Sequence, residues 1–171
     1  MRQFLIVPLL AATPLQAEVK SVNDIGFEVA KTVTVRGDPA RAYAALGQPG
    51  LWWSSEHTYS GDAKNMTMLL RPGGCFCEAL PKDKGAIEHG RVVFTQPGKT
   101  LRLSAALGPL GEEGVSGVLT FALKPAEGGT QVTMNYVVGG YVRGGPKRWA
   151  PAVDAVLGEQ LDRLKAYLDS H

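Results

Sequence analysis

Two histidines and two glutamates are the side chains of this sequence that are best suited to acid–base chemistry or to anchoring a ligand. Glu78 and Glu88 fall on successive predicted strands, His89 follows Glu88 directly, and His57 lies upstream beside a pair of tryptophans. An imidazole can act as a general base or as a pH-sensitive ligand anchor. A carboxyl that points inward is desolvated, which suits a polar anchor or an acid catalyst. The catalytic candidates are Glu78, His57 and His89, and the ordinary alternative for each is a structural or exposed role.

No local motif assigns these residues a reaction. The sequence contains no G-x-S-x-G nucleophile elbow and no G-x-x-x-x-G-K-[ST] phosphate loop. It also lacks the His-x-x-x-His and Cys-x-x-Cys spacings of metal ligands. We therefore predict neither a metal nor a cofactor, while a site assembled in space from the cysteines and a histidine stays open.

The only two cysteines, Cys75 and Cys77, are separated by one residue in a predicted strand. Alternate residues of a strand share a face, with Cα atoms roughly 6.5–7 Å apart and parallel Cβ directions. That geometry does not favour an unstrained disulfide. The sequence therefore predicts free thiols.

The first 17 residues have the pattern of a secretory signal peptide. Arg2 precedes a short apolar run at 4–10, and a small-residue cleavage site ends at Ala17. A buried N-terminal helix is the alternative, but Pro8 and Pro14 fit it poorly. We expect cleavage after about Ala17, a periplasmic or secreted location, and one domain over residues 18–171.

Charge and hydropathy exclude two classes of partner. The formal net charge is +2, and no basic run is interleaved with aromatic residues, so nucleic acid is not expected. No second long apolar run follows the first 17 residues, so we expect no stable membrane insertion after cleavage.

Alternation of apolar and polar residues predicts a mainly antiparallel β protein. Asp38 and Pro39 predict a short helix after the first strand, with a second helical turn in the loop that follows. The predicted strands span residues 27–36, 66–70, 75–80, 87–96, 100–107, 115–123 and 130–138.

The chain ends in its longest helical pattern. An apolar stripe runs from Trp149 to Leu168 at spacings near i, i+4, i+7. Because proline fits poorly inside a helix, Pro151 predicts that the regular helix begins near Ala150 or bends there. Strands in series with helices segregated at the ends indicate an α+β fold, with this helix covering one face of the sheet.

Six segments, in this order along the chain, have a familiar pattern: VTVRGDPARAYAAL, LWW, LRPGGCFCEAL, GRVVFTQPGKTLRLSAALGPL, GVLTFALKPAEGGTQVTMNYVVGGY and LGEQLDRLKAYL. Through them the sequence resembles the START-like, or SRPBCC, helix-grip superfamily, and is similar to its Hsp90-ATPase-activator-like and polyketide-cyclase-like branch. The resemblance covers about residues 25–168. It implies an α+β helix-grip fold, in which a curved antiparallel sheet of about six or seven strands wraps a long C-terminal helix, with two short helices after the first strand.

Members of this superfamily hold an apolar or amphipathic molecule between the sheet and the helix. By the strand phase typical of such proteins, Phe76 and Glu78 face that pocket and the two thiols face outward. Of the neighbouring tryptophans, we expect only one to face the cavity. The predicted ligand-binding residues are Trp52, Trp53, His57, Tyr59, Met68, Phe76, Glu78, Tyr136, Tyr141 and Trp149.

Three functions are compatible with the sequence. The first is an exported protein that binds a small hydrophobic ligand. The second is a cyclase, dehydratase or hydrolase that uses an acid or a histidine in the same cavity, which requires two of the catalytic candidates to converge. The third is a protein-binding module similar to a co-chaperone, and an export signal argues against it.

Overall fold

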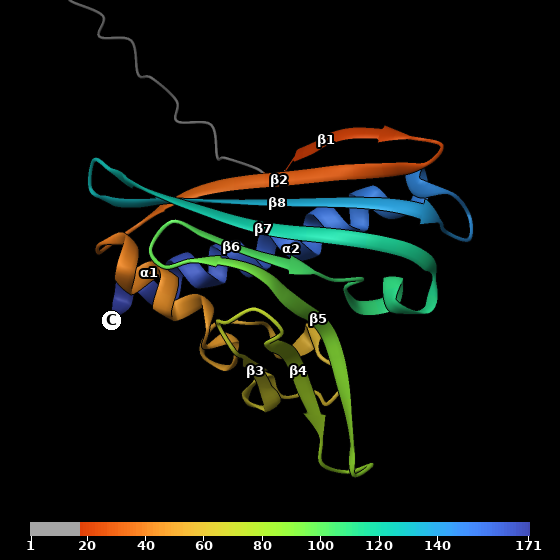
Figure 1. The fold of residues 1–171 in the computed structure, drawn as a ribbon, viewed down its shortest axis with the longest axis horizontal. Coiled ribbons are helices and arrows are strands. Elements are labelled where there is room, and N and C mark those ends of the chain that lie inside the picture. The colour runs from red at the N-terminus through yellow and green to blue at the C-terminus, as the bar shows by residue number, and fades with distance from the viewer. Residues whose placement is uncertain (1–17) are drawn as a thin grey trace, which may run out of the picture.

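A computed structural model describes residues 18–171, which form an eight-stranded antiparallel sheet around a long C-terminal helix (Figure 1). The order across the sheet is β1-β2-β8-β7-β6-β5-β4-β3. The predicted signal peptide lies outside the described residues. The strands are β1 (Glu18–Asn23), β2 (Gly26–Val35), β3 (Met66–Met68), β4 (Cys75–Leu80), β5 (Gly85–Gln96), β6 (Thr100–Ser104), β7 (Gly114–Ala126) and β8 (Gly129–Tyr141).

This architecture confirms the predicted α+β helix-grip fold, with one strand more than the six or seven expected. The additional strand is β1, which pairs with β2 at the edge of the sheet. Most of its side chains are exposed, so its sequence lacks the alternation that marks the other strands. Next to this edge strand, β2 and β8 pair Phe27 with Val138 and Val33 with Val132, all four of which are buried.

The C-terminal helix α2 (Pro146–Ser170) lies across one face of the sheet (Figure 1). Leu157, Leu161 and Leu164 on its apolar stripe are almost completely buried. The helix begins at Pro146 rather than near Ala150, because a proline is well suited to the first helical turn. Pro151 lies inside the helix, where its missing N–H removes one hydrogen bond near the N-terminal end.

Short helices connect the strands that surround the site. Helix α1 (Pro39–Leu46) is capped by Asp38, whose side chain accepts a hydrogen bond from the Arg41 amide at 2.8 Å. The turns η1 (Pro49–Leu51), η2 (Ser55–His57) and η3 (Ala63–Asn65) follow, and η4 (Gly108–Glu112) joins β6 to β7. One helix and three single turns therefore stand where two short helices were predicted.

Cys75 and Cys77 form a disulfide, so the prediction of free thiols is wrong. Their Cα atoms are 5.4 Å apart, closer than in a fully extended strand and within the range of disulfides. The ladder between β4 and β5 shifts register between Phe76 and Cys77. Such a bulge bends and twists the strands locally. The prediction of free thiols rests instead on the Cα spacing of a regular extended strand.

Candidate functional site

A cavity of about 460 Å³ is lined by residues of the η2 segment, β4, β5, η4 and the first half of α2. Its interior surface is mainly aromatic and aliphatic. Trp53, Phe76 and Leu157 are buried lining residues, and Trp149 and Val156 are half-buried ones. The cavity therefore combines a mainly apolar interior with an opening to solvent.

Several predicted ligand-binding residues lie together in this cavity. Of the two neighbouring tryptophans, Trp53 lines the cavity, and its ring packs 5.5 Å from that of Phe76. Trp52 is buried elsewhere and donates a hydrogen bond from Nε1 to the Ala45 carbonyl at 2.8 Å. The predicted residues that line the cavity are Trp53, His57, Tyr59, Phe76 and Trp149, and the catalytic candidate His89 joins them.

Five predicted ligand-binding residues lie outside the cavity lining: Trp52, Glu78, Met68, Tyr136 and Tyr141. Met68 is buried on β3 beside a separate shallow groove. Tyr141 is exposed at the end of β8. Tyr136 is buried, and its hydroxyl donates to the Ala105 carbonyl at 2.9 Å and accepts from the Leu107 amide at 3.1 Å.

Tyr136 supports the cavity wall through hydrogen bonds to the backbone of Ala105 and Leu107. Burial raises the pKa of its hydroxyl to about 12, so the group stays protonated and keeps donating to the Ala105 carbonyl. The segment that it holds leads directly into η4, and Leu107 lines the cavity. Tyr136 therefore positions part of the wall instead of contacting the cavity.

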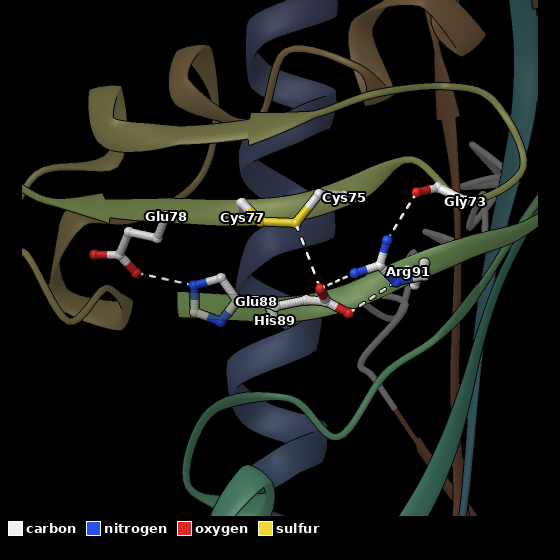
Figure 2. Close-up of a disulfide and its surroundings, with 7 residues drawn as sticks. All are labelled: Gly73, Cys75, Cys77, Glu78, Glu88, His89 and Arg91. Carbon is white, nitrogen blue, oxygen red and sulfur yellow. Dashed lines mark hydrogen bonds and ion pairs between the residues drawn. A yellow bond between two sulfur atoms is a disulfide. The ribbon is translucent and has the colours of Figure 1, made fainter. Parts of the chain in front are cut away.

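Glu78 and His89 form a buried pair beside the cavity (Figure 2). Figure 2 shows the carboxylate of Glu78 on β4 directed at the ring of His89 on β5. His89 Nε2 lies 2.9 Å from Glu78 Oε2. The same carboxylate accepts hydrogen bonds from the backbone amides of Tyr59, at 3.1 Å, and Ser60.

These hydrogen bonds determine the charge of Glu78. Burial raises the pKa of this carboxyl, but hydrogen bonds from Ser60, Tyr59 and His89 outweigh burial and hold the pKa below its ordinary value. An ionised carboxylate only accepts hydrogen bonds, so Nε2 of His89 must carry the proton between them. In the neutral imidazole, Nδ1 is then an acceptor, and no hydrogen bond within residues 18–171 reaches it.

A β-bulge aims His89 at the inner side of the sheet. Phe76 pairs with Gly90 and Cys77 pairs with Glu88, which leaves His89 as the extra residue on β5. His89 and Gly90 are consequently both buried although they are consecutive. A Cβ at position 90 would lie 2.5 Å from Ala105 Cβ, so glycine is needed there. Gly90 is the one signal of this bulge in the sequence.

The opposite edge of the cavity is tied to α2. His57 Nε2 lies 3.0 Å from Glu159 Oε2, so η2 is joined to the helix by a half-exposed pair. The Gln160 side chain accepts a hydrogen bond from the Ser54 amide at 2.8 Å, and Arg163 donates to the Trp52 carbonyl at 2.9 Å. The segment between η1 and η3 is thus held by α2 on one side and by Glu78 on the other.

Sequence reasoning missed the cavity residues of two elements. Glu112 and Pro109 come from η4, which the sequence predicted only as a loop between strands. Val153 and Val156 belong to the predicted apolar stripe of the last helix, but the stripe does not distinguish core from cavity. Glu56 precedes His57 and is exposed at the cavity.

The cavity contains few polar side chains. Within residues 18–171, no group of three or more His, Cys, Asp or Glu side chains is placed to hold a metal ion. No helix in the same range is long and apolar enough to cross a membrane. The polar groups available to a bound molecule are the imidazoles of His57 and His89, the Tyr59 hydroxyl and two exposed carboxylates.

Comparison with known proteins identifies the class. Residues 26–169 match the family described as polyketide cyclase/dehydrase and lipid transport. The chain therefore belongs to this family, and its resemblance to the SRPBCC helix-grip superfamily is confirmed. None of the curated proteins matches the chain significantly.

Solved structures share the fold at low sequence identity. A Mesorhizobium loti protein is 20% identical, with a TM-score of 0.59 over 84% of this chain and 97% of that one. CalU16 from Micromonospora echinospora is 13% identical, with a TM-score of 0.59 over 90% and 85% of the two chains. A conserved Enterococcus faecalis protein of unknown function is 12% identical, with a TM-score of 0.62 over 90% and 77%.

The charge of Glu78 yields a test of the site. A carboxyl whose pKa is lowered on folding adds stability that is present above its unfolded pKa and lost as the pH falls through its folded pKa. Glu78→Gln should lower the free energy of unfolding near neutral pH by roughly 1–3 kcal/mol. The difference from the wild-type protein should shrink in acid, below the ordinary value of 4.5. Urea unfolding at several pH values measures both effects.

Glu127→Gln is the matched control, because Glu127 is exposed in the turn between β7 and β8. It should leave the pH dependence of unfolding unchanged. A Glu78→Gln curve that follows the wild-type curve throughout would show that the carboxylate does not hold the site.

Proposed function

We propose that this protein is an exported binding protein that holds an apolar or amphipathic small molecule in the cavity between the sheet and α2. The observation that carries the proposal is the cavity itself, which has aromatic and aliphatic walls and a few placed polar groups. Its volume of about 460 Å³ falls within the range typical of small-molecule sites. The family description, which names both polyketide cyclisation and lipid transport, supports the same class of ligand.

The contacts around the cavity support a site that is formed before the ligand arrives. Trp53, Phe76 and His89 pack as a continuous cluster. The ring centroids are 5.5 Å apart for Trp53 and Phe76, which meet edge to face, and 5.3 Å apart for Phe76 and His89, which are tilted. Buried aromatic rings contribute large contact areas with few rotatable bonds, so the wall keeps its shape at a small entropic cost. A preformed cavity spends less binding free energy on ordering side chains.

Filling part of the cavity should weaken binding. Val156 faces the cavity from α2, whereas the neighbouring Ala155 is exposed and is not part of the lining. Val156→Phe should weaken binding of an anilinonaphthalene dye on the order of tenfold, about 1.4 kcal/mol, and Ala155→Phe should leave it unchanged. Fluorescence titration measures both affinities. Equal dye affinity in the wild-type protein and both variants, or no dye binding at all, would contradict the proposal.

A second function is favoured by the Glu78–His89 pair. The two catalytic candidates converge beside one cavity at 2.9 Å, whereas His57 is paired separately with Glu159. In this arrangement Glu78 orients the ring, and Nδ1 of neutral His89 can accept a proton from a carbon acid bound in the cavity. The residual carbanion would then lead to a cyclisation or an elimination.

A benzisoxazole that opens on proton abstraction is a suitable probe, because the reaction needs only a base in an apolar site. Removal of the ring C–H proton breaks the N–O bond and forms a nitrile, and the oxygen stays on the benzene ring as a phenolate. His89→Phe should lower the rate constant by about 10²-fold or more, and Glu78→Gln by a smaller factor, as expected when a general base or its orienting partner is lost. His57→Gln serves as the control and should retain most of the activity. A wild-type protein no faster than free imidazole would exclude this function.

Export is the part of the proposal that rests on the N-terminal sequence alone. Cleavage after Ala17 would produce a mature chain that begins at Glu18, the first residue of β1. N-terminal sequencing of the protein recovered from the periplasm or medium of an expressing bacterium tests this. A chain that retains Met1 and stays with the cytosol would contradict export.

A further inference from the structure

The rim of the cavity carries negative charge from two separate elements. Glu56 belongs to η2 and Glu112 to η4, and both are exposed lining residues. Within residues 18–171, neither a lysine nor an arginine lines the cavity. A ligand that enters therefore passes two carboxylates and meets no side chain of permanent positive charge.

Two cationic groups near the rim are already paired with carboxylates of their own. His57 is bonded to Glu159, with Nε2 and Oε2 3.0 Å apart. Arg143 lies close to the end of η4, but its Nε is 2.8 Å from the largely buried carboxylate of Glu113. Burial is the main cause that raises the pKa of the Tyr59 hydroxyl, and the negative charges of Glu112 and Glu78 raise it further. The charge of Glu112 therefore acts on a residue of the cavity lining.

Aromatic faces accompany these carboxylates. Tyr59 is half-exposed at the rim, Trp149 is half-buried, and Trp53 and Phe76 lie deeper. The face of an aromatic ring attracts a cation, most strongly when the cation is partly desolvated. Carboxylates at the rim and aromatic walls below them favour the same charge on a ligand.

The floor of the cavity carries one hydrogen-bonding position that the protein leaves open. His89 is 7% exposed and lines the cavity, and no hydrogen bond within residues 18–171 reaches its Nδ1. Nδ1 is not enclosed by protein, unlike Tyr43 Oη and Asp154 Oδ1, which are the buried unpaired side-chain atoms in this range. A polar group of a bound molecule can therefore reach Nδ1 from the cavity.

We propose that the cavity selects an apolar molecule that carries a positively charged amine, with the apolar body against Trp53 and Phe76 and the cationic group at the rim between Glu56 and Glu112. This inference rests on the proposed binding function and specifies the chemical class of the ligand. Fatty acids and other anionic amphipaths are disfavoured, because their charge would meet the two rim carboxylates.

Four probes with the same twelve-carbon chain separate charge from hydrophobicity: dodecylammonium, dodecyltrimethylammonium, dodecanol and dodecanoate. Displacement of a neutral fluorescent dye, below the concentration at which each probe forms micelles, gives their affinities at low salt. The two cationic probes should bind on the order of tenfold more tightly than dodecanoate. The affinity of dodecanol should lie between that of the cations and that of dodecanoate. Added salt should reduce the difference, because the rim is exposed.

Removal of the two rim charges tests whether Glu56 and Glu112 cause the selectivity for cations. The double variant Glu56→Gln/Glu112→Gln should weaken binding of both cations, with about a two- to fivefold loss for each exposed carboxylate removed. It should leave dodecanol unchanged and strengthen dodecanoate. Glu127→Gln makes the same kind of charge change far from the cavity lining and should alter none of the four affinities.

The outcomes distinguish the two levels of the proposal. If no probe binds, the small-molecule function itself fails. If dodecanol and dodecanoate bind as tightly as the cations, or if the double variant leaves the order of affinities unchanged, selectivity for a cation is overturned while apolar binding stands.

Discussion

The fully buried carboxylate of Glu78 is the constraint on which the geometry of the site depends. A charge removed from water is stable only where hydrogen bonds replace its hydration. Glu78 obtains them from the amides of Tyr59 and Ser60 and from the imidazole of His89. These bonds draw the segment after η2 onto β4 and fix the orientation of a histidine that lines the cavity. A single buried charge thus organises both the wall and the polar floor.

The remainder of the fold makes that position available. The sheet and the leucine stripe of α2 form the core, and the cavity is lined by β4, β5, η4 and the first half of α2. Hydrogen bonds from Gln160 and Arg163 on α2 hold the tryptophan segment against the helix at the side of the cavity. The fold class therefore provides a space, and the side chains around it determine which molecule occupies the space.

Features with local periodicity could be predicted from the sequence. Alternation located the strands that have one buried face, and i, i+4, i+7 spacing located α2. The edge strand β1 was missed because it buries little. The disulfide was missed because the Cα atoms of Cys75 and Cys77 are 5.4 Å apart, closer than in the regular extended strand that the prediction assumed. Phe76 and Glu78 are both buried on β4, as strand phase predicts, but only Phe76 lines the cavity.

The partners of the site residues could not be predicted, because they are distant in sequence. Glu78 bonds with residues 59 and 60, and His57 bonds with Glu159, more than a hundred residues away. Tyr136 and Tyr141 are both tyrosines of β8, yet one is buried behind the wall and the other is exposed. Only the three-dimensional arrangement separates a lining residue from a supporting one.

The protonation of His89 is the most direct measure of whether Glu78 organises the site in this way. Two-bond ¹H–¹⁵N correlation spectra distinguish the two neutral tautomers of a histidine side chain. With Glu78 ionised and bonded to Nε2, the neutral ring of His89 should carry its proton on Nε2 and leave Nδ1 as the acceptor. A neutral His89 with its proton on Nδ1 would contradict the arrangement.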